Sequence, residues 1–366
     1  MAETSDETHP THLSPSELGT KEYWETFYSR TLTHISSKQP PTTPASADQV
    51  SNSERNSDEG RVEDDSNSDT DDDDNGDGDS DYNGDSDPGT SWFSEHNAPQ
   101  KVLSFLTGEG FPLAPCHTLS SSSSTAGSGH RSRGSRRRRG LKLTEQERTS
   151  QPSILDLGTG NGSMLALLRK RGGYRGEMVG VDYSTKSVQL ARELQDSKRH
   201  DAYLSGSDDD DSDFEYATPE TDAEAQAETE EEEEEWHPIR FEEWDILGHT
   251  PGDNLPWFPY GQGGFDIVLD KGTFDAVSLM VEKSECERYP AIAGGLVRKG
   301  GFLIVTSCNW TEEELVRWFT SATPRVEGEA RVSETKLAVW GRVQYPRFRF
   351  GGQEGQGVCT VCFQRV

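Results

Sequence analysis

A glycine-rich segment follows an apolar run near the middle of the chain. Asp156 is followed by Gly158, Gly160 and Gly162, which gives the spacing Asp-x-Gly-x-Gly-x-Gly. Glycines let a backbone turn tightly and approach a bound ligand without Cβ atoms in the way. The segment therefore predicts a loop that binds a cofactor of the nucleotide type.

Two cofactors compete for this loop. A dinucleotide fingerprint needs a third glycine, or an alanine, at the position that Ser163 occupies, and it needs no glycine at Gly162. The spacing therefore favours S-adenosylmethionine over NAD.

An acid follows the next apolar run, about 20 residues beyond the loop. A carboxylate at Asp182 is placed to accept hydrogen bonds from both hydroxyls of a ribose, and Tyr183 beside it is an expected neighbour of the cofactor. The alternative is that Asp182 or Ser184 caps the helix that begins here.

A third acid, Asp245, lies between Trp244 and Ile246, where the predicted strand 239–243 ends. Its carboxylate is placed to accept a hydrogen bond from the adenine amino group, with Ile246 against the ring and Trp244 beside it. The alternative is an ordinary turn acid beside a core tryptophan.

Methyl transfer is expected where the fourth apolar run ends, in Asp270-Lys-Gly-Thr-Phe-Asp275. The Pro-Pro-aromatic segment that adenine and glutamine methyltransferases carry at this place is absent. Asp270 is expected to hold an incoming ammonium, while Phe274, Trp24 or Trp92 offers a cation–π wall. Asp270, Phe274 and Trp24 are thus the expected catalytic residues.

Apolar runs alternate with helical patterns, as in βαβ units, and predict a parallel sheet with these acids at its carboxyl edge. Thr311 followed by Glu314 predicts a capping box. Two last strands separated by a glycine-rich loop predict a closing antiparallel pair. The expected strands are 153–157, 178–181, 239–243, 265–269, 302–306, 336–340 and 358–363.

Low-complexity segments interrupt this pattern and have too few apolar residues to offset the entropy of folding. We expect an N-terminal helical segment at 1–39, a disordered acidic insert at 40–90, a helical segment at 91–115 and a Ser/Arg-rich loop at 116–150. The core follows at 151–366, with an acidic disordered insert at 205–236. The inserts carry about −15 and about −16 of the net charge of −30, which leaves the rest nearly neutral.

Five scattered cysteines and the lack of an apolar leader indicate a reducing compartment, which we expect to be the cytoplasm or also the nucleus. No apolar run is long enough to span a membrane. The acidity argues against nucleic acid as a partner. Cys359 and Cys362 face opposite sides of their predicted strand, so no metal site is expected.

Several segments together resemble a specific family, the lysine methyltransferases that modify translation elongation factor 1-alpha, of the methyltransferase-like protein ten type. The resemblance covers the chain apart from its inserts. Its carriers are Glu17–Trp24 with Phe27-Tyr28, Trp92-Phe93, Asp156–Gly162, Glu243-Trp-Asp245, Phe265–Asp270, Asp270–Ala276, Ser307-Cys-Asn-Trp310 and Val361-Cys-Phe363.

The resemblance implies a Rossmann-like, seven-stranded class I methyltransferase fold with sheet order 3-2-1-4-5-7-6. It also implies a protein-lysine N-methyltransferase that uses S-adenosylmethionine and acts on the elongation factor. We expect the protein to be a monomer. Two alternatives stay open, an inactive methyltransferase fold that serves as a scaffold and a methyltransferase of small molecules.

Overall fold

The computed structural model describes residues 10–37, 93, 96–119, 150–198, 201–203, 238–249, 254–321, 336–350, 353–355 and 357–366. The acidic inserts expected at 40–90 and 205–236 lie outside these residues, as do Trp92 and most of the Ser/Arg-rich loop. What we expect of these segments stays a prediction.

A single seven-stranded sheet organises the described residues, in the order β3-β2-β1-β4-β5-β9-β6. Neighbours are parallel from β3 to β5, and β9 is antiparallel to both β5 and β6. This confirms the expected order 3-2-1-4-5-7-6, since β9 is the seventh strand of this sheet. The strands are β1 (Ile154–Leu157), β2 (Met178–Asp182), β3 (Arg240–Glu243), β4 (Phe265–Lys271), β5 (Val297–Ser307), β6 (Leu337–Val343) and β9 (Cys359–Arg365).

The central strands are buried on both faces, because helices cover the sheet on either side. This explains their nearly continuous apolar sequences. Cys359 and Cys362 belong to two different core clusters, one on each face, as their spacing in a strand predicts. Among the described residues, no group of His, Cys, Asp and Glu is arranged to hold a metal ion.

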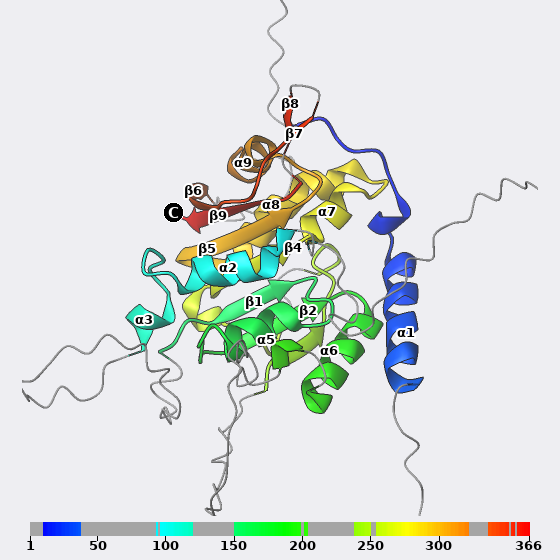
Figure 1. Ribbon diagram of the computed structural model, residues 1–366, viewed down its shortest axis with the longest axis vertical. Helices are drawn as coiled ribbons and strands as arrows, with labels where there is room; N and C mark the ends of the chain where they lie inside the picture. The colour runs from blue at the N-terminus through cyan, green and yellow to red at the C-terminus, as the bar shows by residue number, and fades with distance from the viewer. Residues whose placement is uncertain are drawn as a thin grey trace, which may run out of the picture.

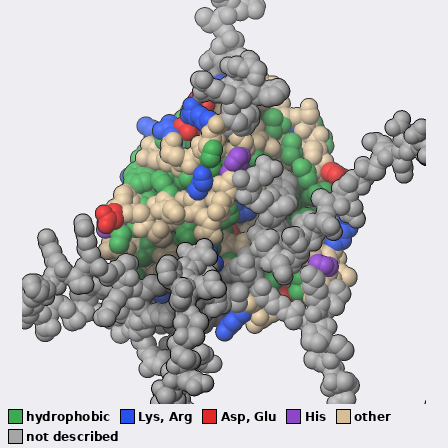
Figure 2. Space-filling model, viewed as in Figure 1, with side chains coloured by type: hydrophobic (Ala, Val, Ile, Leu, Met, Phe, Trp, Pro, Cys, Tyr) green, Lys and Arg blue, Asp and Glu red, His purple; other side chains and the backbone are tan. Residues whose placement is uncertain are grey.

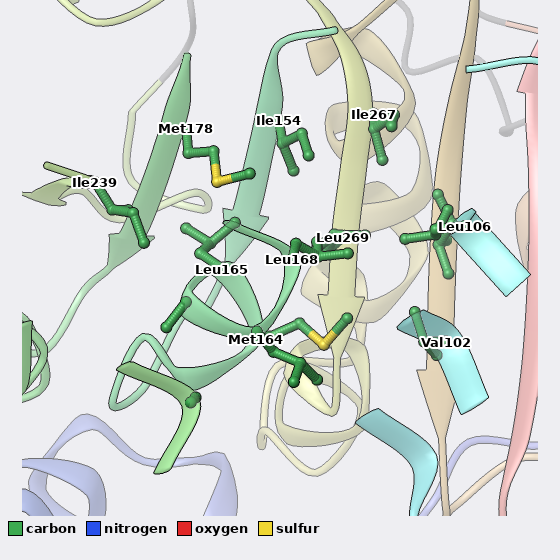
Figure 3. Close-up of a cluster of buried hydrophobic side chains, with 14 of the residues drawn as sticks. Val102, Leu106, Ile154, Met164, Leu165, Leu168, Met178, Ile239, Ile267 and Leu269 are labelled. Atoms are coloured by element: carbon green, nitrogen blue, oxygen red, sulfur yellow. The ribbon is translucent and has the colours of Figure 1, made fainter. Parts of the chain in front are cut away.

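Four helices pack on the first face of the sheet (Figure 1). In Figure 3, Leu168 lies beside Leu269, and both belong with Leu165, Ile154 and Ile267 to one buried cluster, so the helix after the glycine loop covers the middle of the sheet. The helices are α1 (Lys21–Ser37), α2 (Ala98–Thr107), α5 (Ser163–Lys170) and α6 (Thr185–Ser197).

The second face is covered by α7 (Thr273–Ser278), α8 (Lys283–Leu296) and α9 (Glu312–Thr320). The expected capping box starts α9, with Thr311 and Glu314 bonded to each other's backbone. The sequence did not predict α7 and α8. It also did not predict the shorter elements η1 (Glu17–Gly19), α3 (Pro115–Thr118), η3 (Asp201–Tyr203) and η4 (Tyr260–Gln262), or the hairpin of β7 (Phe348–Phe350) and β8 (Gln353–Gly355).

The N-terminal segment is fastened to the loop between α7 and α8. Ser16 donates its backbone N–H to the Leu279 carbonyl at 3.0 Å, and Lys283 donates to the Leu13 carbonyl. Ser16 also caps η1, and the extended backbone of Thr20 separates η1 from α1. This anchor places α1 beside α6 at one edge of the molecule (Figure 1).

Charged side chains on the described surface lie in small separate groups on the face shown in Figure 2. This distribution agrees with a core that carries little of the net charge. Within the described part of the chain, every helix is too short or too polar to cross a membrane.

Candidate cofactor and methyl-transfer site

A pocket of about 510 Å³ opens where β1, β2 and β4 end. The register of the sheet brings these ends together, since Leu157 of β1 lies between Val181 of β2 and Asp270 of β4. The pocket is lined by Gly19, Lys21, Trp24, Tyr28, Leu157–Gly160, Val181–Tyr183, Trp244–Gly248, Lys271–Thr273, Ala276, Val277, Met280, Glu282 and Glu285.

The glycine loop has the left-handed backbone that its sequence predicts. Gly158 and Gly160 line the pocket with φ of +57° and +58°, a conformation that side chains rarely adopt. Gly162 is outside the pocket lining and is the N-terminal cap of α5, with φ of +75°. A Cβ on Gly162 would lie 2.5 Å from the ring of Phe241. Two of the three glycines therefore face the pocket, and the third allows the ring of Phe241 to pack closely against the turn.

Asp156 does not line the pocket but supports the glycine loop through a hydrogen bond. Its carboxylate is buried and accepts a hydrogen bond from the Thr159 hydroxyl at 2.8 Å. Burial raises the pKa of Asp156 to about 6. Asp156 therefore fixes the side chain of Thr159, which does line the pocket.

Asp182 lines the pocket and braces the loop. Its carboxylate accepts from the backbone of Gly160 at 3.1 Å and Ser184 at 2.9 Å, and from the Ser187 hydroxyl at 2.7 Å. Burial raises the pKa of Asp182, and these three bonds lower it. Ser184, whose hydroxyl oxygen accepts from the Ser187 backbone, is the cap of α6. Capping therefore falls to Ser184, and the ribose contact of Asp182 stays a prediction.

The end of β3 supplies a further wall. Asp245 accepts from the backbone of Leu247 at 2.9 Å and lines the pocket with Trp244 and Ile246, as expected for an adenine site. Tyr183 also lines the pocket, and its hydroxyl donates to the carbonyl of Thr20 at 3.3 Å. All the residues expected beside the nucleoside thus lie in one pocket.

Asp270 is not placed to hold an ammonium, which corrects the sequence-based expectation. Its side chain is 1% exposed and outside the pocket lining. One oxygen accepts from the backbone of Thr273 at 2.9 Å and of Phe274 at 3.1 Å, and the other accepts from the Tyr289 hydroxyl at 2.7 Å. Burial raises the pKa of Asp270 to about 7. Asp270 therefore fixes the start of α7.

Phe274 does not form a wall of the pocket either. Its ring is fully buried and stacks on the rings of Tyr289 and Trp310, with centroids 5.5 and 6.1 Å away. The physical reason is α7, which begins at Thr273 and turns Phe274 into the core while Thr273 and Ala276 face the pocket.

Trp24 is the one expected catalytic residue that lines the pocket. Its indole N–H donates to the Leu18 carbonyl at 2.8 Å, which fixes the ring. The pocket is also lined by residues that were not predicted as site residues, namely Tyr28, Lys271, Thr273, Glu282 and Glu285. Helical spacing was the available signal for Tyr28, which is one turn beyond Trp24.

The residues present suit S-adenosylmethionine. The pocket volume falls in the range of cofactor sites. Glycines 158 and 160 leave room that a Cβ would fill, and carboxylates at the ends of β2 and β3 can accept from hydroxyl and amino groups.

Comparison with known proteins agrees with this site. Residues 148–203, which hold the glycine loop and Asp182, match the family model described as a methyltransferase domain. The chain is 28% identical over 281 residues to "Protein-lysine N-methyltransferase EFM4" of Saccharomyces cerevisiae, covering 75% of this chain and 82% of that protein. It is 27% identical over 216 residues to the human "EEF1A lysine methyltransferase 2", and the alignment covers 58% of this chain and 66% of the human protein.

Among solved structures, the chain is similar to the N-methyltransferase NodS of Bradyrhizobium japonicum in complex with S-adenosyl-L-homocysteine. The identity is 13% and the TM-score 0.34, with 58% of this chain and 78% of NodS covered. The chain therefore contains a methyltransferase domain with the sheet order of a class I methyltransferase fold, its pocket suits S-adenosylmethionine, and it is similar in sequence to the yeast and human proteins named above.

Proposed function

We propose that the protein is a protein-lysine N-methyltransferase that modifies a lysine of translation elongation factor 1-alpha. One observation carries this proposal. The yeast and human relatives are named as lysine methyltransferases, and the alignment with the yeast protein extends over 82% of that protein. The proposal includes action as a monomer in the cytoplasm.

The walls of the pocket suit an incoming lysine. The exposed carboxylate of Glu282 lines the pocket and would attract a side chain that arrives as an ammonium, whereas the half-buried carboxylate of Glu285, which also lines the pocket, is paired with Arg288. The ring of Trp24 lines the pocket too, and it offers a face to a cationic or methylated amine.

S-adenosylmethionine supplies a methyl group on a positively charged sulfur. The protein's own task is to orient the amine and to exclude water, which aligns the reactants and removes solvent from them. An acceptor lysine with an ordinary pKa near about 10.4 must lose its proton first. The reaction should therefore become faster as the pH rises from about 7 to about 9.

The test uses the full chain, labelled S-adenosylmethionine and a lysate from cells that lack their own copy of this enzyme. Mass spectrometry of the labelled band should find one or more methyl groups on a lysine of elongation factor 1-alpha. Purified elongation factor should accept the label as well. A Gly158→Ala variant, whose new Cβ would overlap the Thr273 hydroxyl, is the inactive control.

Label on a different protein, or only on small molecules, would contradict the proposed substrate while leaving the methyltransferase activity in place. A chain that binds the cofactor but labels nothing would contradict the proposed activity.

A further inference from the structure

Tyr28 brings an uncommitted hydroxyl from α1 to the glycine loop. The residue is 7% exposed and lines the pocket. Its hydroxyl lies 3.0 Å from the point where a Cβ on Gly160 would be. A side chain from the N-terminal helix therefore covers a loop that is more than a hundred residues away in sequence.

Four hydroxyl groups line the pocket, and three of them donate to protein acceptors. The Thr159 hydroxyl donates to Asp156, the Thr273 hydroxyl to the Leu157 carbonyl, and the Tyr183 hydroxyl to the Thr20 carbonyl. The fourth belongs to Tyr28, which has no hydrogen-bond partner among the described residues. The residue is more than nine-tenths buried, but its hydroxyl is not one of the enclosed unpaired polar atoms, so the hydroxyl is open to the pocket and can donate to a ligand there.

We propose that Tyr28 binds the amino-acid end of S-adenosylmethionine by donating its hydroxyl to the carboxylate of the cofactor. The acids Asp182 and Asp245, at the ends of β2 and β3, are expected to take the ribose and the adenine. The glycine loop leads away from them to the first residue of α5, and the start of a helix favours negative charge. The hydroxyl of Tyr28 lies over this loop.

Tyr28 stays a donor at neutral pH. Burial raises the pKa of Tyr28 well above its ordinary value, and the nearby carboxylate of Asp182 raises it further. The phenol therefore keeps its proton and can offer it to a ligand carboxylate, which makes a charge-assisted hydrogen bond.

The ring of Tyr28 is fixed before any ligand binds. It stacks against Trp24 with centroids 5.9 Å apart and meets Phe27 edge to face at 5.3 Å. Because the side chain has little freedom to lose on binding, most of the hydrogen-bond energy should appear as affinity.

The test compares two ligands that differ at the amino-acid end. S-adenosylhomocysteine carries the carboxylate, and 5′-methylthioadenosine has the same nucleoside and sulfur without it. Calorimetry with the whole chain should show that Tyr28→Phe lowers the affinity for S-adenosylhomocysteine about tenfold and leaves the affinity for 5′-methylthioadenosine unchanged. The control is Tyr23→Phe, which removes a hydroxyl from the same helix outside the pocket lining and should change neither affinity.

The decisive quantity is the ratio of the two affinities within each variant, because a partial loss of folded protein would lower both and leave the ratio unchanged. An unchanged ratio in Tyr28→Phe would overturn the proposal. No methyl acceptor enters this experiment, so its result is independent of the proposed substrate.

Discussion

The hydroxyl of Thr273 donates to the carbonyl oxygen of Leu157 across 2.6 Å. This bond ties the first turn of α7, which follows β4, to the last residue of β1. The same side chain occupies the space beside Gly158, so that a Cβ there would overlap the Thr273 hydroxyl. The glycine loop is therefore shaped from two sides, by its own backbone and by α7.

Gly158→Ala should abolish cofactor binding. The new methyl group would push Thr273 away from Leu157 and would also strain a backbone with φ of +57°. We expect the affinity for S-adenosylhomocysteine, measured by calorimetry, to fall at least a hundredfold, because the loop that forms the pocket must shift.

Gly173→Ala is the matched control for this loss. Gly173 has φ of +77°, and the nearest atom to its Cβ is 4.0 Å away in Pro115, so the substitution adds strain without overlap. It should cost about 1 kcal/mol of stability and leave the cofactor affinity unchanged. Equal losses of affinity in the two variants would contradict the role given to Thr273.

Asp270→Asn should leave cofactor affinity within about twofold, because the carboxylate contacts α7 and Tyr289 and not the pocket. It should also change how stability depends on pH. Folding raises the pKa of Asp270 to about 7 from 3.8, so between these values the folded protein holds a proton that the unfolded chain has lost. In the wild type this group's contribution therefore decreases as the pH rises through that window.

Asparagine does not titrate, so the stability of Asp270→Asn relative to wild type should increase from about pH 4 to about pH 7. Thermal unfolding across this range measures the difference. Asp156, whose pKa burial raises to about 6, acts in the same direction and should leave part of the slope in the variant. A parallel pH dependence in the two proteins would show that Asp270 titrates normally.

Asp245→Asn should lower the affinity for the cofactor without lowering the stability of the fold. Among the described residues, its side chain accepts one hydrogen bond, from the backbone N–H of Leu247, and an amide oxygen can keep that bond. The amide NH2 that replaces the second oxygen is a donor and cannot accept a hydrogen bond from the adenine amino group, so we expect about tenfold lower affinity for S-adenosylhomocysteine with an unchanged unfolding temperature.

Asp182→Asn is the contrasting variant, because three protein donors converge on its carboxylate. It should lose about 2 kcal/mol of stability as well as cofactor affinity. If Asp245→Asn unfolded as early as Asp182→Asn, the assignment of Asp245 to ligand binding would be wrong.

The nucleoside side of the pocket could be predicted from sequence because parallel strands end at one edge of a sheet. Asp182 ends one predicted strand and Asp245 follows another, and the two strands are neighbours in the sheet, so the strand order brings the two acids together. The spacing of the glycines also predicted the tight turn that follows β1. These predictions required no knowledge of where individual side chains point.

The acceptor side could not be predicted in the same way. Helix α7 has six residues, too few for a periodic signal, and its first turn decides that Asp270 becomes a cap and Phe274 a core residue. The pocket role of Tyr28 depends on how α1 packs on α6, a contact between segments far apart in sequence. Such side-chain directions follow from tertiary packing.

Trp24 can be tested as the aromatic wall for the acceptor lysine. Trp24→Phe keeps a ring at the pocket and loses the bond to the Leu18 carbonyl, whereas Trp24→Leu loses the ring as well. If the ring face attracts the amine, kcat/KM for the protein acceptor should fall about tenfold in Trp24→Leu and much less in Trp24→Phe. Steady-state assays at saturating cofactor measure this difference. Equal losses in the two variants would assign Trp24 to holding the N-terminal segment, through Leu18, and would leave the acceptor without an aromatic contact from this residue.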